Sequence, residues 1–385
     1  MATLTQNALN EIICEIDYSI DAIIPFLREA DHFLSVSDGI KRELNRLGFY
    51  GNDDELLECF KATLEKAGFS KDERKHAKKW LCDNRLPSPK YNYPMRLCFA
   101  FGLSGQPALD FLWKVCRVNG FNFRRVDDIV FCYCLENGKT YSEARELLFR
   151  YEENTISQDH NEIEATKRTS FLRSIFQNFA VMDERVFFEL LCKNKKNFIR
   201  YSKTAHEEVL RLGEHLAVTI KSQIAEYNFR RKQCALMGGY DYNGTLYPEI
   251  IFAFELISKA SKGTGTSFDD IMNRFPQERY LADMFRLPSE ATDKEHDKVR
   301  KAFVLLYFAN YALDPPPDDF FGDFAIALNE ELDHCGYAKL YPANPFDWLI
   351  LKCIHSLDYA NQEIEDNPVE LFNAVLMQIA EDENI

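Results

Sequence analysis

Residues 93–118 read YPMRLCFAFGLSGQPALDFLWKVCRV and predict two helices joined by a tight turn. The apolar segment Tyr93 to Phe101 is followed by Gly102, and glycine readily adopts the left-handed conformation that ends a helix. Ser104 can then cap the next apolar segment, Ala108 to Val118. A helix, a turn of a few residues and a second helix therefore form the centre of this chain.

The same plan continues downstream of this stretch. The apolar segments Val126 to Leu135 and Glu143 to Arg150 are separated by a short polar turn. Within that turn, Thr140 precedes Glu143 by three residues, which is the spacing of a capping box. These four segments in succession predict an all-α fold, because each has helical length and none is bounded as a strand would be.

A polar helix is predicted just upstream. Ser70 and Glu73 have capping-box spacing, and the helix that they open runs through Leu81 and stops before Pro87. From Lys71 to Arg125, twelve Lys and Arg against four acids give a charge of +8, whereas the whole chain carries −15. The remainder therefore carries −23. This asymmetry is typical of a phosphate-binding face, although a solvated helix surface, or a face docked on acids of the same chain, accounts for it equally simply.

A resemblance to a family covers most of the chain. The shared features are short motifs in the central segment and near the C-terminus, and they resemble an uncharacterised family of bacterial all-helical proteins associated with mobile elements. Its front part is similar to a degenerate phage-repressor-type helix-turn-helix. The resemblance implies an all-helical fold and a setting in mobile elements or phage defence, but no activity that transfers to particular residues. The motifs are Lys78-Lys79-Trp80-Leu81, Arg96 to Leu103, Phe121-Asn122-Phe123, Tyr133 to Gly138, Asn197-Phe198, Thr204-Ala205, Cys335-Gly336-Tyr337, Leu340-Tyr341 and Asn344 to Trp348.

The bulk composition is that of an ordinary globular protein, with 46% hydrophobic and 28% charged residues over 385 positions. The longest apolar run, Ala302 to Leu313, is shorter than the roughly 20 residues that a membrane span needs. No secretory leader is recognisable, and the eleven cysteines lie mostly in apolar helical stretches. We expect reduced thiols and a cytoplasmic protein that does not bind membranes.

The chain is predicted to form two helical lobes made of multi-helix bundles without a substantial sheet. They are joined near residues 152–162 and by a long spine helix from about Thr204 to Phe229. The firmest part is a C-terminal four-helix bundle, because Asn344-Pro345 and Asn367-Pro368 are paired helix starts. The predicted segments are residues 1–67, an N-terminal helical bundle; 68–151, a helix-turn-helix-like module; 163–260, a helical spine region; and 296–385, the C-terminal helical bundle.

No complete catalytic or metal-binding motif is present. Cys132 and Cys134 point to different faces of a helix, so they are a poor pair of metal ligands, and no cofactor is expected. Arg200 and His206 have the spacing of one class of helical RNase, in which histidine acts on a ribose hydroxyl while arginine holds the phosphate. Chance supplies one such pair in a chain of this composition. We therefore expect a protein that is not an enzyme, with this RNase as an alternative.

The sequence favours a regulatory or adaptor protein whose central module binds an anionic partner, either nucleic acid or an acidic protein. A purely protein-binding scaffold is the other alternative, and the sequence does not define the oligomeric state. If nucleic acid binds, the basic side chains should hold phosphates, while Trp80 or Tyr91 stacks on a base. The candidate nucleic-acid-binding residues are Lys75, Lys78, Lys79, Trp80, Arg85, Lys90 and Tyr91.

Overall fold

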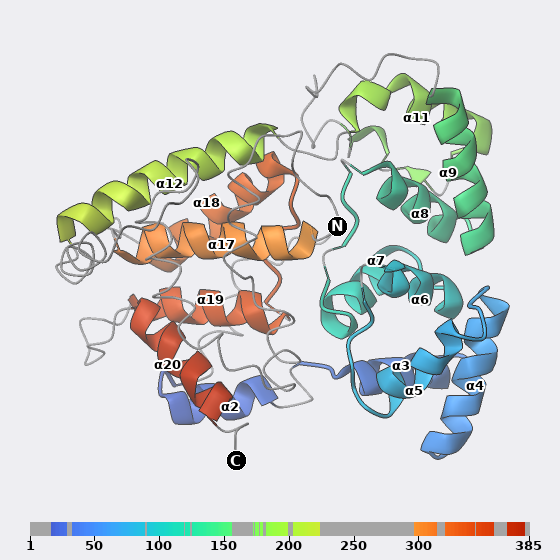
Figure 1. Cartoon of the computed structure of the whole chain (residues 1–385), viewed down its shortest axis with the longest axis horizontal. Coiled ribbons are helices and arrows are strands. Elements are labelled where there is room, and N and C mark those ends of the chain that lie inside the picture. The colour runs from blue at the N-terminus through green and yellow to red at the C-terminus, as the bar shows by residue number, and fades with distance from the viewer. Residues whose placement is uncertain are drawn as a thin grey trace, which may run out of the picture. The chain divides into compact units, whose positions relative to one another are not determined.

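A computed structural model describes most of the chain and divides it into two compact units (Figure 1). Unit 1 is formed by Ala30–Ser202 with the short segment Gly336–Ala338, and unit 2 by Ala2–Glu29, Lys203–Cys335 and Lys339–Ile385. The prediction of an all-α fold is confirmed, because the described residues form helices and no strand. The described residues are 17–28, 33–88, 91–118, 120–123, 125–155, 172, 174–176, 178–179, 182–198, 203–223, 296–313, 320–342, 344–357 and 368–381.

Unit 1 is a succession of helices, many of which pack on a neighbour along the chain, as α3 does on α4 and α8 on α9 (Figure 1). The predicted apolar segments all form helices, and the structure extends several of them by a few residues. Its elements are α3 (Val36–Arg46), α4 (Asp53–Lys66), η1 (Glu73–Lys75), α5 (His76–Leu81), α6 (Tyr93–Phe101), α7 (Gly105–Asp110), η3 (Phe111–Val115), α8 (Val126–Glu136), α9 (Tyr141–Thr155), α11 (Glu184–Lys193) and η5 (Lys195–Asn197).

One hydrophobic core runs through unit 1 from Val36 to Leu191. Its centre is aromatic: the Phe60 ring stacks on Phe101 with centroids 5.8 Å apart, and Tyr133 stacks on Phe187 at 3.9 Å. Helices on both sides of residue 67 line this core. The predicted N-terminal bundle, from residue 36 onward, and the predicted central module therefore belong to one hydrophobic core.

Several glycines of unit 1 have positive φ at turns, and two of them follow α6 and α4. Gly102 has φ +61 directly after α6, as predicted, and Gly68 has φ +80 after α4. Ser104 occupies the predicted N-cap position of α7, but its side chain makes no capping hydrogen bond. The segment predicted as one helix from Ala108 to Val118 is not a single α-helix, since α7 is followed directly by the π-helix η3.

Unit 2 contains the predicted C-terminal helices, which pack on one another. The Asn344 side chain accepts a hydrogen bond from the backbone N–H of Phe346 at 3.0 Å, so this predicted helix start is confirmed. Asn367 lies outside the described residues. The elements of the unit are α2 (Ile20–Arg28), α12 (Lys203–Gln223), α17 (His296–Leu313), α18 (Phe320–Cys335), α19 (Pro345–His355) and α20 (Pro368–Glu381).

Two further helices join this bundle. α12 lies against α17 and α18, and α2 lies against α20. The structure thus divides the predicted segment 1–67 between the units, with α2 in unit 2 and α3 and α4 in unit 1. Most of the predicted joint at residues 152–162, and residues 224–295, lie outside the described residues. No described helix is long and apolar enough to cross a membrane.

Candidate nucleic-acid interface

The candidate interface is built on the short segment from Ser70 to Leu81. Its predicted capping box is confirmed: the backbone N–H of Ser70 donates to the Glu73 carboxylate at 2.8 Å, and the N–H of Glu73 donates to the Ser70 hydroxyl at 3.3 Å. The segment starts as the 3₁₀ turn η1 and continues as α5. Because α5 contacts both α3 and α4, its position in unit 1 is fixed.

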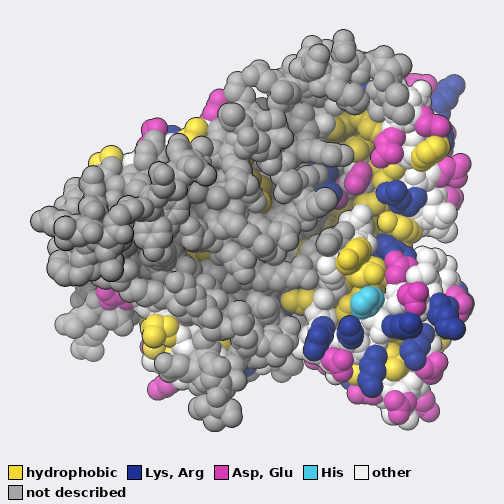
Figure 2. Space-filling view, viewed as in Figure 1, with side chains coloured by type: hydrophobic (Ala, Val, Ile, Leu, Met, Phe, Trp, Pro, Cys, Tyr) yellow, Lys and Arg dark blue, Asp and Glu magenta, His cyan; other side chains and the backbone are white. Residues whose placement is uncertain are grey.

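The segment is amphipathic, and its two sides have opposite chemistry. Ala77, Trp80 and Leu81 are buried against the core. Lys71 in the turn before η1, Lys75 at the end of η1, and Lys78 and Lys79 on α5 are all exposed. We call these four lysines, together with the exposed Arg85 that follows α5, the basic face. Figure 2 shows Lys and Arg side chains gathered over the part of unit 1 built from α3, α4 and α5, with acidic side chains around them.

Most of the basic face is not neutralised by neighbouring acids. Within the part of the chain that the structure describes, Lys71, Lys78, Lys79 and Arg85 form no ion pair. Lys75 pairs with Asp72 at 2.7 Å, but both side chains are well exposed. Exposed pairs of this kind are worth about 0–1 kcal/mol, so a stronger anion can replace Asp72.

The twelve basic residues between Lys71 and Arg125 do not all lie on the basic face. Arg96 is buried and pairs with Glu73, while Arg117 is buried as well. Arg74 is half-buried and pairs with Glu65 at 2.7 Å. Lys114 and Arg125 are also half-buried, and each lies beside an aspartate close by in the sequence, Asp110 and Asp127 respectively. Lys90 and Arg124 lie outside the described residues.

The two aromatic candidates differ in exposure. Trp80 is only 3% exposed and packs against Tyr93, with ring centroids 5.2 Å apart, so the prediction that Trp80 stacks on a base is wrong. Tyr91 is 57% exposed and lies 5.4 Å from the Tyr93 ring.

Lys71 was missing from the predicted site. Its position four residues before Lys75 is a signal in the sequence that could have identified it.

Arg96 connects this segment to the rest of unit 1. Its guanidinium donates to the Glu73 carboxylate and to the backbone carbonyl of Gly68, at 3.3 Å for each Nη2 contact, and it lies 3.8 Å over the Phe69 ring. The hydrogen bond from Arg96 lowers the pKa of Glu73 to about 2, against the effect of burial. Arg96 thus fixes both the turn after α4 and the start of η1.

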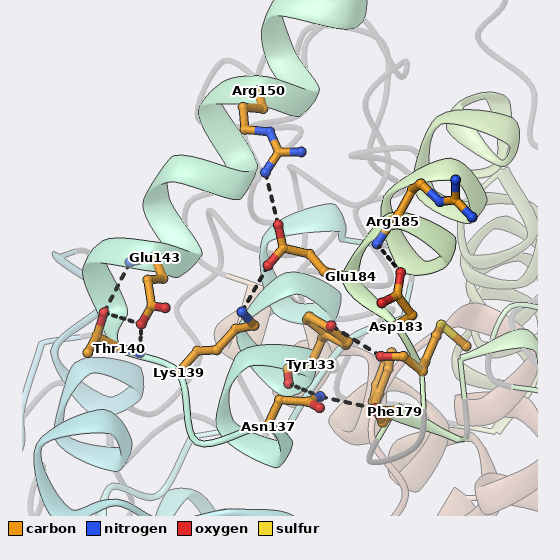
Figure 3. A network of polar contacts seen from close by, with 11 residues as sticks. Tyr133, Asn137, Lys139, Thr140, Glu143, Arg150, Phe179, Asp183, Glu184 and Arg185 are labelled. Atoms are coloured by element: carbon orange, nitrogen blue, oxygen red, sulfur yellow. Dashed lines mark hydrogen bonds and ion pairs between the residues drawn. The ribbon is translucent and has the colours of Figure 1, made fainter.

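A second polar network in unit 1 has a structural role (Figure 3). Glu184 at the start of α11 accepts hydrogen bonds from Lys139 at 2.8 Å and from Arg150 at 3.0 Å. These hydrogen bonds, first the one from Lys139, lower the pKa of Glu184. The network joins α9, the turn before it and α11, and Thr140 and Glu143 confirm the second predicted capping box.

Unit 2 contains its own buried charges. Arg300 donates to both carboxylate oxygens of Asp347, at 2.9 and 2.8 Å, and both side chains are 3% exposed. Lys352 is fully buried with its ammonium 3.9 Å from the Tyr18 ring centroid, and Tyr18 also contacts His355. Burial, followed by the nearby Lys352, lowers the pKa of His355 to about 4. These contacts hold α17, α19 and the residues just before α2 together.

The structure does not describe the side chains of the alternative RNase pair. Arg200 lies outside the described residues, and His206 lies in the first turns of α12, where only its backbone is described. Among the described residues no cluster of three or more His, Cys, Asp or Glu could hold a metal ion. Cys132 and Cys134 are both buried, and burial raises the pKa of Cys134 to about 12.

Comparison with known proteins adds no relative: no family model, curated protein or solved structure matches the chain.

Proposed function

We propose that this protein binds nucleic acid through the basic face of unit 1 and acts as a regulatory or adaptor protein rather than as an enzyme. The observation that carries the proposal is the set of exposed lysines of the basic face, three of which form no ion pair within the described residues. A cationic side chain that is not neutralised by the protein can release a counterion from a nucleic acid, and this release is the main source of backbone affinity.

The arrangement of helices around the face supports the proposal. α4, the left-handed turn at Gly68 and the η1–α5 segment follow one another as the two helices of a helix-turn-helix do. In such motifs the second helix enters the major groove and the first lies across the backbone. Here the second helix carries the lysines, and α3 and α4 support it from behind.

The proposal is tested by the fluorescence anisotropy of a labelled nucleic acid titrated with the full chain. We expect binding that weakens steeply between about 50 and 200 mM salt. The variant Lys78→Glu/Lys79→Glu should lose this binding. The matched control is Arg145→Glu/Lys193→Glu, which makes the same change of charge at two exposed positions on α9 and α11 and should bind like the parent chain.

Two results would contradict the proposal. Absence of binding at low salt, with retention of an acidic polypeptide by the same lysines, would identify an acidic protein as the partner. Cleavage of labelled RNA that disappears in His206→Ala would instead support the RNase.

A further inference from the structure

We infer that the basic face binds the phosphate backbone of double-stranded DNA without reading its bases. This inference rests on the proposed function and specifies its ligand. Four of the five cations on the face are lysines. The lysine ammonium is a point charge on a flexible stem, and it contacts phosphate from many directions, whereas base edges are read mainly by planar side chains that donate two hydrogen bonds in a fixed geometry.

The planar side chains around the face are already engaged by the protein. Arg74 holds Glu65 at 2.7 Å, and the Asn84 side-chain oxygen accepts a hydrogen bond from the backbone N–H of Ser37 at 3.1 Å. Arg96 is buried against Glu73. The segment thus directs its base-reading side chains inward and its point charges outward. Arg85 is the exception, because it is planar and exposed, so it has its own variant in the test below.

The arrangement of the lysines fits a duplex. Lys71 lies in the turn before η1, Lys75 at the end of η1, and Lys78 and Lys79 on α5, so the four lysines follow the segment over its whole length. The major groove of B-DNA is about 12 Å wide. With α5 facing that groove, the flexible stems of these lysines can contact phosphates along its edges.

A single strand fits the face less well. Proteins that bind single strands without sequence preference combine cations with aromatic rings on which bases stack. Around α5, the aromatic rings of Trp80 and Tyr93 are 3% and 6% exposed and cannot accept a base. Tyr91 is exposed, but it is a single ring that already packs on Tyr93.

The test measures the anisotropy of labelled duplexes of equal length and unrelated sequence, one rich in A·T and one rich in G·C, with a single strand of the same length. We expect the two duplexes to bind with dissociation constants that agree within about threefold, whereas specific readout changes affinity by about fivefold or more per base pair. Four phosphate contacts predict a slope of log K against log salt of about −3 to −4.

Charge-preserving and charge-removing variants separate backbone contact from base readout. Lys78→Arg/Lys79→Arg should bind both duplexes like the parent chain. Lys78→Gln/Lys79→Gln should make the slope less steep by about 1.8, because each lost phosphate contact removes about 0.9. Arg145→Gln/Lys193→Gln is the matched control and should leave the slope unchanged.

The outcomes distinguish this inference from the proposed function. A preference of about tenfold or more for one duplex would overturn the inference while nucleic-acid binding stands, and loss of that preference in Arg85→Lys would assign the readout to Arg85. Tighter binding to the single strand that is lost in Tyr91→Ala would also overturn it. Binding to neither form would overturn the proposed function itself.

Discussion

Replacing Glu73 with glutamine should destabilise unit 1 at the point where the basic face begins. The Glu73 carboxylate receives two hydrogen bonds from Arg96 and one from the backbone N–H of Ser70. Glutamine keeps the shape of the side chain but removes the charge that pairs with a buried guanidinium. Arg96 is 8% exposed, so its charge would then be left without its carboxylate partner in a poorly hydrated site.

The magnitude follows from the pKa of Glu73, which is lowered from 4.5 to about 2, with the hydrogen bond from Arg96 as the largest cause. At 1.36 kcal/mol per pH unit this difference corresponds to about 3 kcal/mol. The Glu73 side chain is 28% exposed, so solvent screens part of the interaction. We therefore expect the free energy of unfolding of unit 1 to fall by about 1–2 kcal/mol in Glu73→Gln at pH 7.

The effect should depend on pH in a defined direction. Because the pKa of Glu73 is lower in the folded protein, its stabilisation is complete above its ordinary value of 4.5 and is lost as the pH falls through about 2. The parent chain and Glu73→Gln should therefore differ most at neutral pH, and the difference should shrink progressively below about pH 4.5.

The assay is urea unfolding followed by tryptophan fluorescence in a Trp348→Phe background. The chain has three tryptophans, and the two that remain, Trp80 and Trp113, both lie in unit 1, so the signal reports on that unit. Glu146→Gln is the matched control, since Glu146 is an exposed glutamate on α9. An equal loss of stability at pH 7 and pH 3, or no loss at pH 7, would refute this account of Arg96.

Three further predictions concern packing, buried charge and thiol reactivity. Asp347→Asn should lower the free energy of unfolding of unit 2 by about 3–5 kcal/mol, because it leaves Arg300 buried without its carboxylate. Gly39→Ala should destabilise unit 1 by about 1–3 kcal/mol, because a Cβ there would lie 2.9 Å from the Cβ of Val115 and closer to its methyl groups. A maleimide should modify the exposed Cys82 well before the buried cysteines of unit 1, as checked by peptide mapping.

Each of these predictions has a control. Trp348 fluorescence during urea unfolding reports on Asp347→Asn, and Glu370→Gln on the exposed side of α20 should be neutral. For Gly39→Ala, the second substitution Val115→Ala should recover part of the loss, and additive effects of the two would argue against the contact. Early labelling of Cys98, whose pKa is raised by burial, would contradict the third prediction.

Local signals in the sequence predicted the helices of this protein well. Ser70 with Glu73, Thr140 with Glu143, and Asn344 before Pro345 each mark a helix start, because the side chain that satisfies the first free N–H groups lies within a few residues of them. The resulting helices, and hence the all-α class, needed no tertiary information.

Properties that depend on tertiary contacts were harder to predict. Trp80 follows two lysines and so seemed exposed, although the helical repeat places it beside Ala77 on the buried side. Arg96 looked like part of a basic surface, but only the fold brings Glu73 to it. The π-helix at Phe111–Val115 has no signature, since one extra residue per turn leaves an apolar pattern almost unchanged.

The position of α2 has a consequence for the order in which the protein can fold. α2 is the first of the described helices but packs on α20, and all of Ala30–Ser202 lies between the early and late parts of unit 2. During synthesis, all the described helices of unit 1 exist once Ser202 has left the ribosome, whereas α2 must wait for more than 160 further residues, from Ser202 to Pro368, before its partner exists. In the sequence, unit 1 therefore resembles an insertion into unit 2, and the packing of α2 on α20 is the late, long-range step that slows folding and leaves an apolar helix exposed to aggregation in the meantime.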